Sequence, residues 1–243
     1  DSDDEEEGEQ KDEENIEANE EPWISPIPKV IYDVLKRIFN YGFTLISQPS
    51  YTLKAQIIKT LRLIFPLLCT DYKLVLPTMA SNWSVLVTLI TASNSLSTVV
   101  DLRTTLSREQ INITIESLKF VTEILNQDKN QKEYFFSSKF QETWSFISKH
   151  SELIKKSLKV KQKTGIVVAE KALVTLESFP LLKESLVEFL IVGAQNYEKT
   201  IPDLTRFEIL KLCYGLQIPQ NLNFSRDTQC ILEVLKTKSI PCT

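Results

Sequence analysis

The single histidine of this 243-residue chain, His150, limits the catalytic arrangements that the sequence could form. A Ser-His-Asp triad or a Cys-His pair would have to use it as the base, and a metal site rich in histidine is impossible. Its neighbours Ser148, Lys149, Ser151 and Glu152 are typical of the polar end of a helix. We therefore interpret His150 as a solvated or capping residue and expect no histidine-based catalysis.

The other residue types that enzymes use are no better placed for chemistry. Glu184 and Glu188 lie one helical turn apart and could suggest an acid and a base, but charges at this spacing usually form a solvated helix face. Every glycine stands alone, so neither a phosphate-binding loop nor a dinucleotide-binding motif can be written. The glycines are Gly8, Gly42, Gly165, Gly193 and Gly215. The sequence predicts no enzyme activity, no cofactor and no bound metal.

The four cysteines, Cys69, Cys213, Cys230 and Cys242, are widely scattered and form no Cys-x-x-Cys motif. This spacing favours buried thiols in a reducing compartment over a disulfide framework or a zinc site. No basic segment followed by an apolar core and a cleavage site is visible near Asp1. We expect a protein of the cytosol or the nucleus.

A cluster of lysines is the best candidate for binding an anionic partner. It could contact phosphates and would then bind in a strongly salt-dependent way. The cluster has no arginine and no interleaved aromatic residue, so neither bidentate nor stacking recognition is evident, and we favour a loop between two helical repeats. The proposed partner or anion surface consists of Lys155, Lys156, Lys159, Lys161 and Lys163, with Lys149 preceding it.

Charge is divided unevenly along the chain. Residues 1–21 contain thirteen acidic residues and one lysine, whereas the remainder contains 27 basic and 19 acidic residues and carries a net charge of +8. With Ile16 as its only large apolar residue, the acidic segment cannot bury enough surface to offset the entropy cost of ordering. We predict a disordered acidic linker at 1–21 and a helical-repeat domain at 22–243. An acidic run before a helical array suggests the C-terminal piece of a longer protein.

Ser2 precedes Asp3, Asp4 and Glu5, a setting that an acid-directed kinase could use. Ser2 is therefore a candidate phosphosite, although a plain charged linker is the preferred interpretation. The acidic segment is also a candidate to fold back on the lysine cluster and suppress nonspecific binding.

Apolar residues repeat at helical spacing through most of the remaining chain. The first such segment covers residues 29–47, and the second runs to Leu68 after the Gln48-Pro49-Ser50 break. Together they span about forty residues, close to the period of roughly 40 to 47 residues in HEAT-type helix pairs. The predicted inner face of the first helix consists of Ile31, Leu35, Ile38, Phe39 and Ile46.

Further helices are predicted at residues 74–91, 107–127, 138–149, 165–177, 183–198, 203–216 and 228–236. Ser107 with Gln110, and Ser138 with Gln141, fit the capping-box pattern at the start of a helix. No Asn-Gly or Asp-Gly hairpin turn occurs, and the apolar runs fall short of the roughly 20 residues that span a bilayer. The predicted fold is all-α, an α-solenoid of antiparallel helix pairs (HEAT/armadillo-like).

Aromatic residues gather near the predicted helix ends, where they could anchor a partner or cover the edge of the stack. We expect core or edge packing for all of them. They are Trp23, Phe135, Phe136, Tyr197 and Phe224.

Two segments carry a family resemblance. The first has Leu74-Val75-Leu76-Pro77 followed by Trp83, Leu86 and Val87, and the second has Phe135, Ser138-Lys139-Phe140 and Trp144. Together with the acidic linker, they resemble the C-terminal helical-repeat region of the Tel-two-interacting protein one family, the largest subunit of the Triple T cochaperone complex. The family's usual histidine after Leu-Pro is absent, and Ser84 and Ser145 replace the usual prolines after tryptophan. The resemblance indicates a divergent member.

The resemblance implies a non-catalytic scaffold for protein–protein interaction. Its partners would be two sister helical-repeat subunits, phosphatidylinositol-kinase-related kinases as clients and a heat-shock chaperone, and no membrane is implied. Two alternatives stay open: a helical-repeat adaptor for an unrelated client, such as a transport or phosphatase scaffold, and a nucleic-acid-associated solenoid that uses the Lys155 to Lys163 cluster.

Overall fold

The computed structural model describes residues 26–92, 108–149 and 179–238. Within these ranges all the regular secondary structure is helical, which confirms the all-α prediction for this part of the chain. The predicted acidic linker, Ser2, His150, the lysine surface and the helix expected at 165–177 lie outside the described residues.

The helices occur close to their predicted positions. Ser50, from the predicted break, caps α2 by accepting a hydrogen bond from the amide of Leu53 at 3.3 Å. The elements are α1 (Lys29–Leu45), α2 (Tyr51–Leu68), the 3₁₀ turn η1 (Cys69–Asp71), α3 (Tyr72–Ala92), α4 (Arg108–Asn130), the helix of residues 137–149, α7 (Pro180–Asn196), α8 (Asp203–Gly215) and α9 (Arg226–Lys238).

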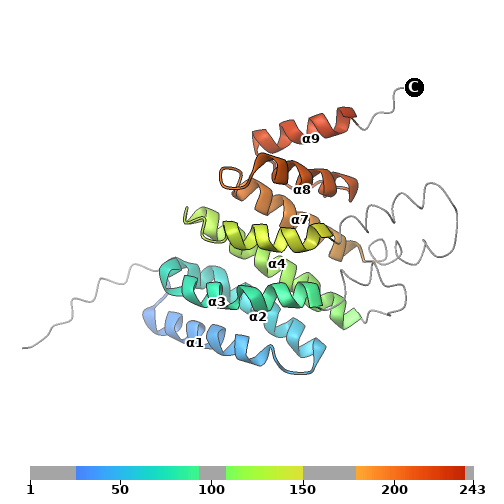
Figure 1. Cartoon of the computed structure of the whole chain (residues 1–243). Helices are drawn as coiled ribbons and strands as arrows, with labels where there is room; N and C mark the ends of the chain where they lie inside the picture. The colour runs from blue at the N-terminus through green and yellow to red at the C-terminus, as the bar shows by residue number, and fades with distance from the viewer. Residues whose placement is uncertain (1–25, 93–107, 150–178, 239–243) are drawn as a thin grey trace, which may run out of the picture.

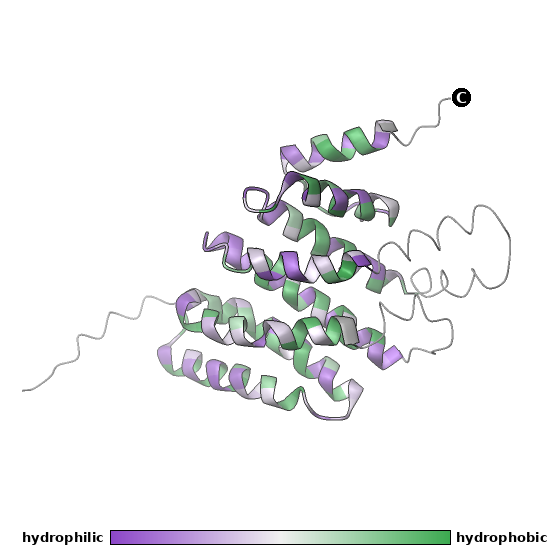
Figure 2. Ribbon diagram, in the orientation of Figure 1, coloured by the Kyte–Doolittle hydropathy of each residue, from purple (hydrophilic) through white to green (hydrophobic). Residues whose placement is uncertain are grey.

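The helices stack in chain order, with α1 at one end and α9 at the other (Figure 1). Helix α4 lies inside the stack and packs against α2, α3 and α7. Figure 2 shows apolar and polar residues alternating within the helices, as helices that pack on one side and meet water on another require. The arrangement is compatible with a helical solenoid.

Aromatic rings hold the first helices against α4. The Phe39 and Phe65 rings stack with centroids 6.0 Å apart, and the Phe120 ring meets Phe65 edge-on at 5.7 Å. Phe43 lies 6.2 Å from Phe120 in a stacked arrangement. Because such pairs bury large apolar area and prefer defined geometries, this cluster fixes α1 and α2 on α4.

The predicted capping box at Ser138 is wrong. The helix begins at residue 137, so Ser138 lies inside its first turn. The amides of Phe135 and Phe136, just before the helix, donate instead to the carboxylate of Asp128 on α4. A side chain distant in the sequence therefore satisfies amides near the helix start, which a local sequence pattern does not reveal. The other predicted box begins at Ser107, which lies outside the described residues.

The predicted inner face of α1 is correct only in part. Phe39 and Ile46 are buried, with 1% and 4% of their surface exposed, but Ile31 and Ile38 are 51% and 46% exposed. Helix α1 is apolar on two sides, and periodicity alone cannot tell which side packs against the neighbouring helices.

Aromatic packing at the helix ends follows the prediction for most of the described residues. Phe136 and Tyr197 are fully buried, and Phe224 is partly buried against the core. Phe135, by contrast, is 45% exposed. Trp83 and Trp144, which carry the family resemblance, are both buried and act as core residues.

One helical run in the described part of the chain is apolar and long enough to cross a membrane by length and composition, contrary to the expectation from its apolar runs. It covers Tyr51–Ile90, and its most apolar 18-residue stretch has a mean hydropathy of 1.3. The run is this long because η1 joins α2 to α3 without a break. Core helices of globular proteins pass the same test, and here 33% of this 18-residue stretch is buried in the stack.

Candidate interaction surface

The structure leaves the predicted site residues untested. Lys155, Lys156, Lys159, Lys161, Lys163 and Ser2 all lie outside the described residues. Lys149, at the end of the 137–149 helix, is described and exposed. The anion-binding surface and the phosphosite therefore stay predictions. Three other features of the described residues are candidates for a functional role: a buried carboxylate, a polar groove and an exposed apolar face.

The buried carboxylate belongs to Asp128, which is 0% exposed near the end of α4. Its Oδ1 accepts hydrogen bonds from the Tyr72 hydroxyl at 3.0 Å and from the Phe135 amide at 3.1 Å. Its Oδ2 accepts from the Tyr197 hydroxyl at 2.7 Å and from the Phe136 amide at 3.0 Å. One side chain thus joins α3, α4, the segment before the 137–149 helix and the residue after α7.

The two tyrosines are held in the protonated state that this arrangement needs. Burial raises the pKa of Tyr72 and of Tyr197 well above the usual tyrosine range, and the negative charge of Asp128 raises each pKa further. Both phenols therefore stay donors at neutral pH. Because both carboxylate oxygens already accept two hydrogen bonds from the protein, we interpret Asp128 as a structural joint rather than as a binding or catalytic group.

The sequence offered no signal for this joint. Tyr72 lies 56 positions before Asp128, and Tyr197 lies 69 positions after it. In the sequence, Asp128 is one acid among the polar residues that end a helix. Only the stacking of α3, α4 and α7 brings its partners together.

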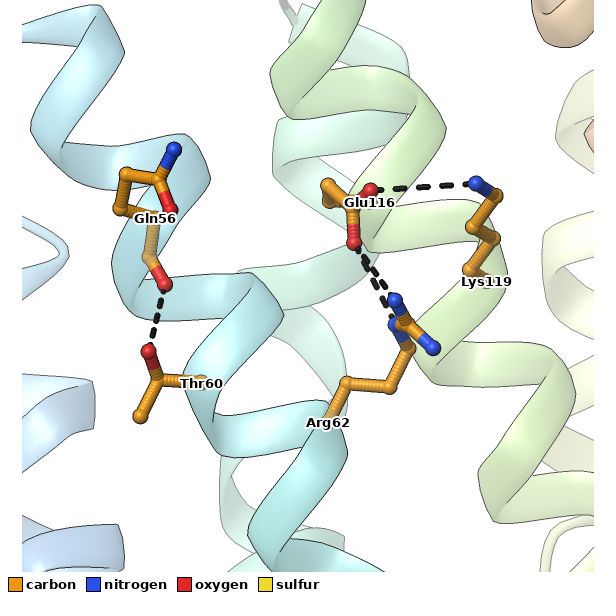
Figure 3. A network of polar contacts seen from close by, with 5 residues as sticks. All are labelled: Gln56, Thr60, Arg62, Glu116 and Lys119. Atoms are coloured by element: carbon orange, nitrogen blue, oxygen red, sulfur yellow. Dashed lines mark hydrogen bonds and ion pairs between the residues drawn. The ribbon is translucent and has the colours of Figure 1, made fainter.

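A polar groove of about 260 Å³ lies where α2, α4 and α7 meet. At one side, Arg62 Nε and Nη2 donate to Glu116 Oε2 at 3.3 and 3.1 Å, and Lys119 Nζ lies 3.8 Å from Glu116 Oε1 (Figure 3). The groove is lined by Arg62, Lys119, Thr122, Glu123, Asn126 and Glu188. Ion pairs that are partly exposed contribute little to stability, so this network sets the polarity of the groove more than it holds the fold.

Glu188 is half-buried, so it is not part of a plain solvated face as the spacing with Glu184 suggested. Burial raises the pKa of the Glu188 carboxyl, the charge of Glu184 raises it further, and Lys119 acts in the opposite direction. The only histidine of the chain lies outside the described residues. Within the described ranges, no three His, Cys, Asp or Glu side chains gather closely enough to hold a metal ion.

Two described cysteines fit the prediction of buried thiols. Burial raises the pKa of the Cys69 thiol to about 12, and it also raises the pKa of Cys213. Cys230 on α9 is exposed, so the prediction is wrong for this residue. All three are free thiols.

An apolar face remains exposed on the first helix pair, α1 and α2. We call it the end face, because α1 lies at one end of the stack (Figure 1). On α2 it shares a stripe with Gln56 and Thr60, which lie on the side of α2 away from α4 (Figure 3). Its six residues, each between 46% and 59% exposed, are Ile31, Val34 and Ile38 of α1 and Leu53, Leu63 and Leu67 of α2.

Sequence reasoning missed the end face because it placed Ile31 and Ile38 on the inner face of the first helix and did not consider Val34, Leu63 and Leu67. The signal was present: α1 and α2 are apolar on more than one side, whereas a helix that packs on one side only needs a single apolar stripe. Exposed apolar residues on the outside of a protein are candidates for an interaction site where they gather into one patch.

Comparison with known proteins finds sequence similarity to TEL2-interacting protein 1 of Saccharomyces cerevisiae. The two sequences are 40% identical over 72 residues, which are 30% of this chain and 7% of that protein. The similarity therefore spans a small part of a much longer relative. No family model matches the chain. No solved structure matches it either.

Proposed function

We propose that this chain is a non-catalytic scaffold that binds a TEL2-type protein through the surface of its helix stack. The observation that carries the proposal is the 40% identity over 72 residues to a protein named for its interaction with TEL2. The Trp83 and Trp144 segments, which resemble the same family, point in the same direction.

The architecture suits this role. We propose that α1 with α2, and α3 with α4, are successive antiparallel helix pairs of a HEAT-like array. The aromatic cluster around Phe120 and the joint at Asp128 hold these helices in fixed positions. A surface that is already ordered does not pay the entropy cost of ordering when it binds, and this favours a scaffold.

The resemblance extends the proposal to a cochaperone role. In this role the chain would join sister helical-repeat subunits and a heat-shock chaperone in supporting phosphatidylinositol-kinase-related kinases, in the cytosol or the nucleus. The short similarity supports the interaction with TEL2 most directly, so that interaction is tested first.

The test is co-purification of the tagged 243-residue chain with purified TEL2 of Saccharomyces cerevisiae. We expect a complex that elutes together in size-exclusion chromatography and has a defined stoichiometry by light scattering. The matched control is the variant Asp128→Ala, whose stack we expect to be destabilised and which should retain less TEL2. Absence of a complex with the folded wild-type chain would contradict the proposal.

A second experiment separates the scaffold from its alternatives. Affinity purification with mass spectrometry should recover TEL2 and a kinase of the expected class, whereas recovery of an unrelated client would favour a general adaptor. Salt-dependent binding to nucleic acid that is lost on changing Lys155, Lys156 and Lys159 to Glu would favour the nucleic-acid alternative.

A further inference from the structure

The polar groove is built from helices that pack against one another inside the stack. Arg62 comes from α2, Glu188 comes from α7, and the other four lining residues come from α4, which contacts both of these helices. Its volume of about 260 Å³ is below the range of roughly 300 to 1,000 Å³ that is typical of pockets for small molecules. A single side chain of a partner protein is an occupant of suitable size.

The two cations of the groove are already used within the chain. Arg62 donates to one oxygen of Glu116 at 3.3 and 3.1 Å, and Lys119 Nζ lies 3.8 Å from the other oxygen (Figure 3). Among the described residues, neither Glu123 nor Glu188 takes part in an ion pair. An anionic ligand would have to compete with Glu116 for either cation.

Glu123 and Glu188, by contrast, line the groove as carboxylates that the chain compensates poorly. Gln127 Nε2 donates to Glu123 Oε1 at 2.8 Å, which leaves Oε2 to accept from a ligand. Glu188 is half-buried, and its burial and the nearby charge of Glu184 both raise the pKa of its carboxyl, although Lys119 lowers it. The ionised form of Glu188 would therefore gain from a further cation.

The remaining polar groups also favour a ligand that donates hydrogen bonds. The Thr122 hydroxyl donates to the Leu118 carbonyl at 2.8 Å, so its oxygen can only accept from a ligand. Glu116 and Glu184 add negative charge, since Glu116 pairs with both cations and Glu184 acts on Glu188. With all groups ionised, two cations meet four carboxylates, a net charge of −2. A guanidinium, which is cationic and only donates, is complementary to such a groove.

We infer that the groove between α2, α4 and α7 receives an arginine side chain of the TEL2-type partner, whose guanidinium binds the carboxylates of Glu123 and Glu188. The identity of the partner rests on the proposed function, whereas the preference of the groove for a cation can be tested without TEL2. Both carboxylates are partly buried, so their pairing should slow the dissociation of the partner more than it speeds association.

The first test measures the affinity of the full chain for purified TEL2. The variant Glu123→Gln/Glu188→Gln removes two negative charges and keeps the size of the side chains, so we expect the affinity to fall by at least about tenfold. The matched control is Glu142→Gln/Glu208→Gln, because both are exposed glutamates outside the groove, on the 137–149 helix and on α8. The control should bind within about twofold of the wild type.

A stability measurement separates a binding role from a structural one. The glutamines break no ion pair and relieve the repulsion between Glu184 and Glu188, so the double variant should unfold at the temperature of the wild type or above it. If circular dichroism shows lost helix, the single variant Glu188→Gln replaces it in the binding assay and should lower the affinity by at least about threefold. A folded variant that binds as tightly as the wild type would overturn the inference.

The variant Lys119→Gln tests the sign of the charge on the ligand. It removes a cation that acts on Glu188 and would compete with an incoming guanidinium, so the affinity for TEL2 should stay equal or rise. If Lys119→Gln instead weakens binding while the double glutamine variant binds normally, the ligand is an anion, and the inference is wrong.

The second test needs no TEL2. Its probe is N-acetyl-arginine amide, added to the full chain while the carboxyl signals of isotope-labelled glutamates are followed by NMR through a pH titration. We expect the probe to move the titration of Glu188 to lower pH, since a nearby guanidinium favours the ionised carboxylate, and to leave exposed Glu142 unchanged. An identical titration of Glu188 with and without the probe would contradict the inference.

The outcomes separate the two proposals. If the wild type binds TEL2 and the double glutamine variant binds equally well, the inference is overturned and the proposed function stands. If the wild type does not bind TEL2, the proposed function falls, and the titration with the arginine probe alone decides whether the groove takes a guanidinium.

Discussion

Asp128 is the residue on which the arrangement of the middle helices most depends. Its carboxylate has four donors from three parts of the chain, and each of them is buried or partly buried. We expect Asp128→Ala to lower the free energy of unfolding by about 3 to 5 kcal/mol, because it leaves these donors without an acceptor. Urea unfolding followed by circular dichroism measures this loss.

The control for Asp128 is Asp33→Ala, since Asp33 is an exposed acid on α1. It should change the unfolding free energy by no more than about 0.5 kcal/mol. Tyr72→Phe and Tyr197→Phe each remove one donor and should cost about 1 to 2 kcal/mol. Equal effects of the two aspartate variants would contradict the role of Asp128 as a joint.

Buried tyrosines predict a loss of stability at high pH. Burial raises the pKa of Tyr32 from 10.0 to about 12, and the charge of Asp71 raises it further. Tyr72 and Tyr197 shift in the same direction. The folded state therefore holds these protons more tightly than the unfolded state does. Their contribution to stability is complete below pH 10 and is lost as the pH rises through the folded-state pKa values.

The measurement is urea unfolding at about pH 9 and about pH 11, where the unfolded phenols change from neutral to mostly ionised. We expect the unfolding free energy of the wild type to fall between the two. The Tyr72→Phe variant lacks one of the titrating groups, so its loss should be smaller. An identical loss in both proteins would show that Tyr72 does not contribute.

At the scale of the elements, the contact between α7 and the 137–149 helix depends on Gly193. A Cβ atom there would overlap the Phe140 ring, which already packs against Phe189 at 5.3 Å and Tyr197 at 6.1 Å. We expect Gly193→Ala to lower the unfolding free energy by about 1 to 3 kcal/mol, because the ring has no free space to move into. Thermal and urea unfolding both measure this loss.

Two other glycines provide graded controls for Gly193. In Gly42→Ala the new Cβ would meet the end of the Leu61 side chain at 2.5 Å, and this flexible group can move, so a smaller loss is expected. Nothing lies within 4 Å of the new atom in Gly215→Ala. That variant should be neutral or more stable by up to about 1 kcal/mol, since alanine favours helix. If Gly215→Ala lowered the unfolding free energy most and Gly193→Ala lowered it least, the close contact between Gly193 and Phe140 would be refuted.

The sequence predicted most helices well and some helix faces poorly. Helix ends depend on local features such as Ser50 and on the apolar period, so α2 and α8 begin and end close to their predicted bounds. The Ser138 cap failed because Asp128, from another helix, satisfies the amides before that helix. The packed side of α1 could not be predicted, since Ile31 and Phe39 fit the same period although only Phe39 is buried.

At the scale of the whole molecule, stability should decline from the middle of the stack towards α9. Helix α4 contacts neighbours on several sides, whereas α9 packs mainly against α8 and buries few residues, Leu235 among them. Hydrogen exchange followed by mass spectrometry should find the slowest amides in α4 and faster ones in α9, because a terminal helix can open without the rest.

A pair of substitutions checks this gradient. Leu118→Ala, in the core of α4, should speed exchange throughout the described helices. Leu235→Ala should speed it in α9 alone. If α9 exchanges as slowly as α4, the stack unfolds as one unit and the gradient is wrong.

The candidate interaction surface was less predictable than the fold. The residues chosen from the sequence, Lys155 to Lys163, were selected for their charge, and they lie outside the described residues. Ile31 and Ile38 of the end face were predicted to point inward, because a sequence shows that a residue is apolar but not whether a neighbouring helix covers it. Recognition of the end face required the exposed fractions of Val34 and Leu63.

The positions of the cysteines allow local opening of the helix stack to be measured by thiol labelling. A maleimide needs a thiolate, so it should modify exposed Cys230 quickly. The buried thiols of Cys69 in η1 and Cys213 in α8 should react only in molecules where those elements have opened. The labelling rates of these two thiols, divided by the rate in the unfolded chain, would give the equilibrium constants of opening at two levels of the stack without any engineered probe.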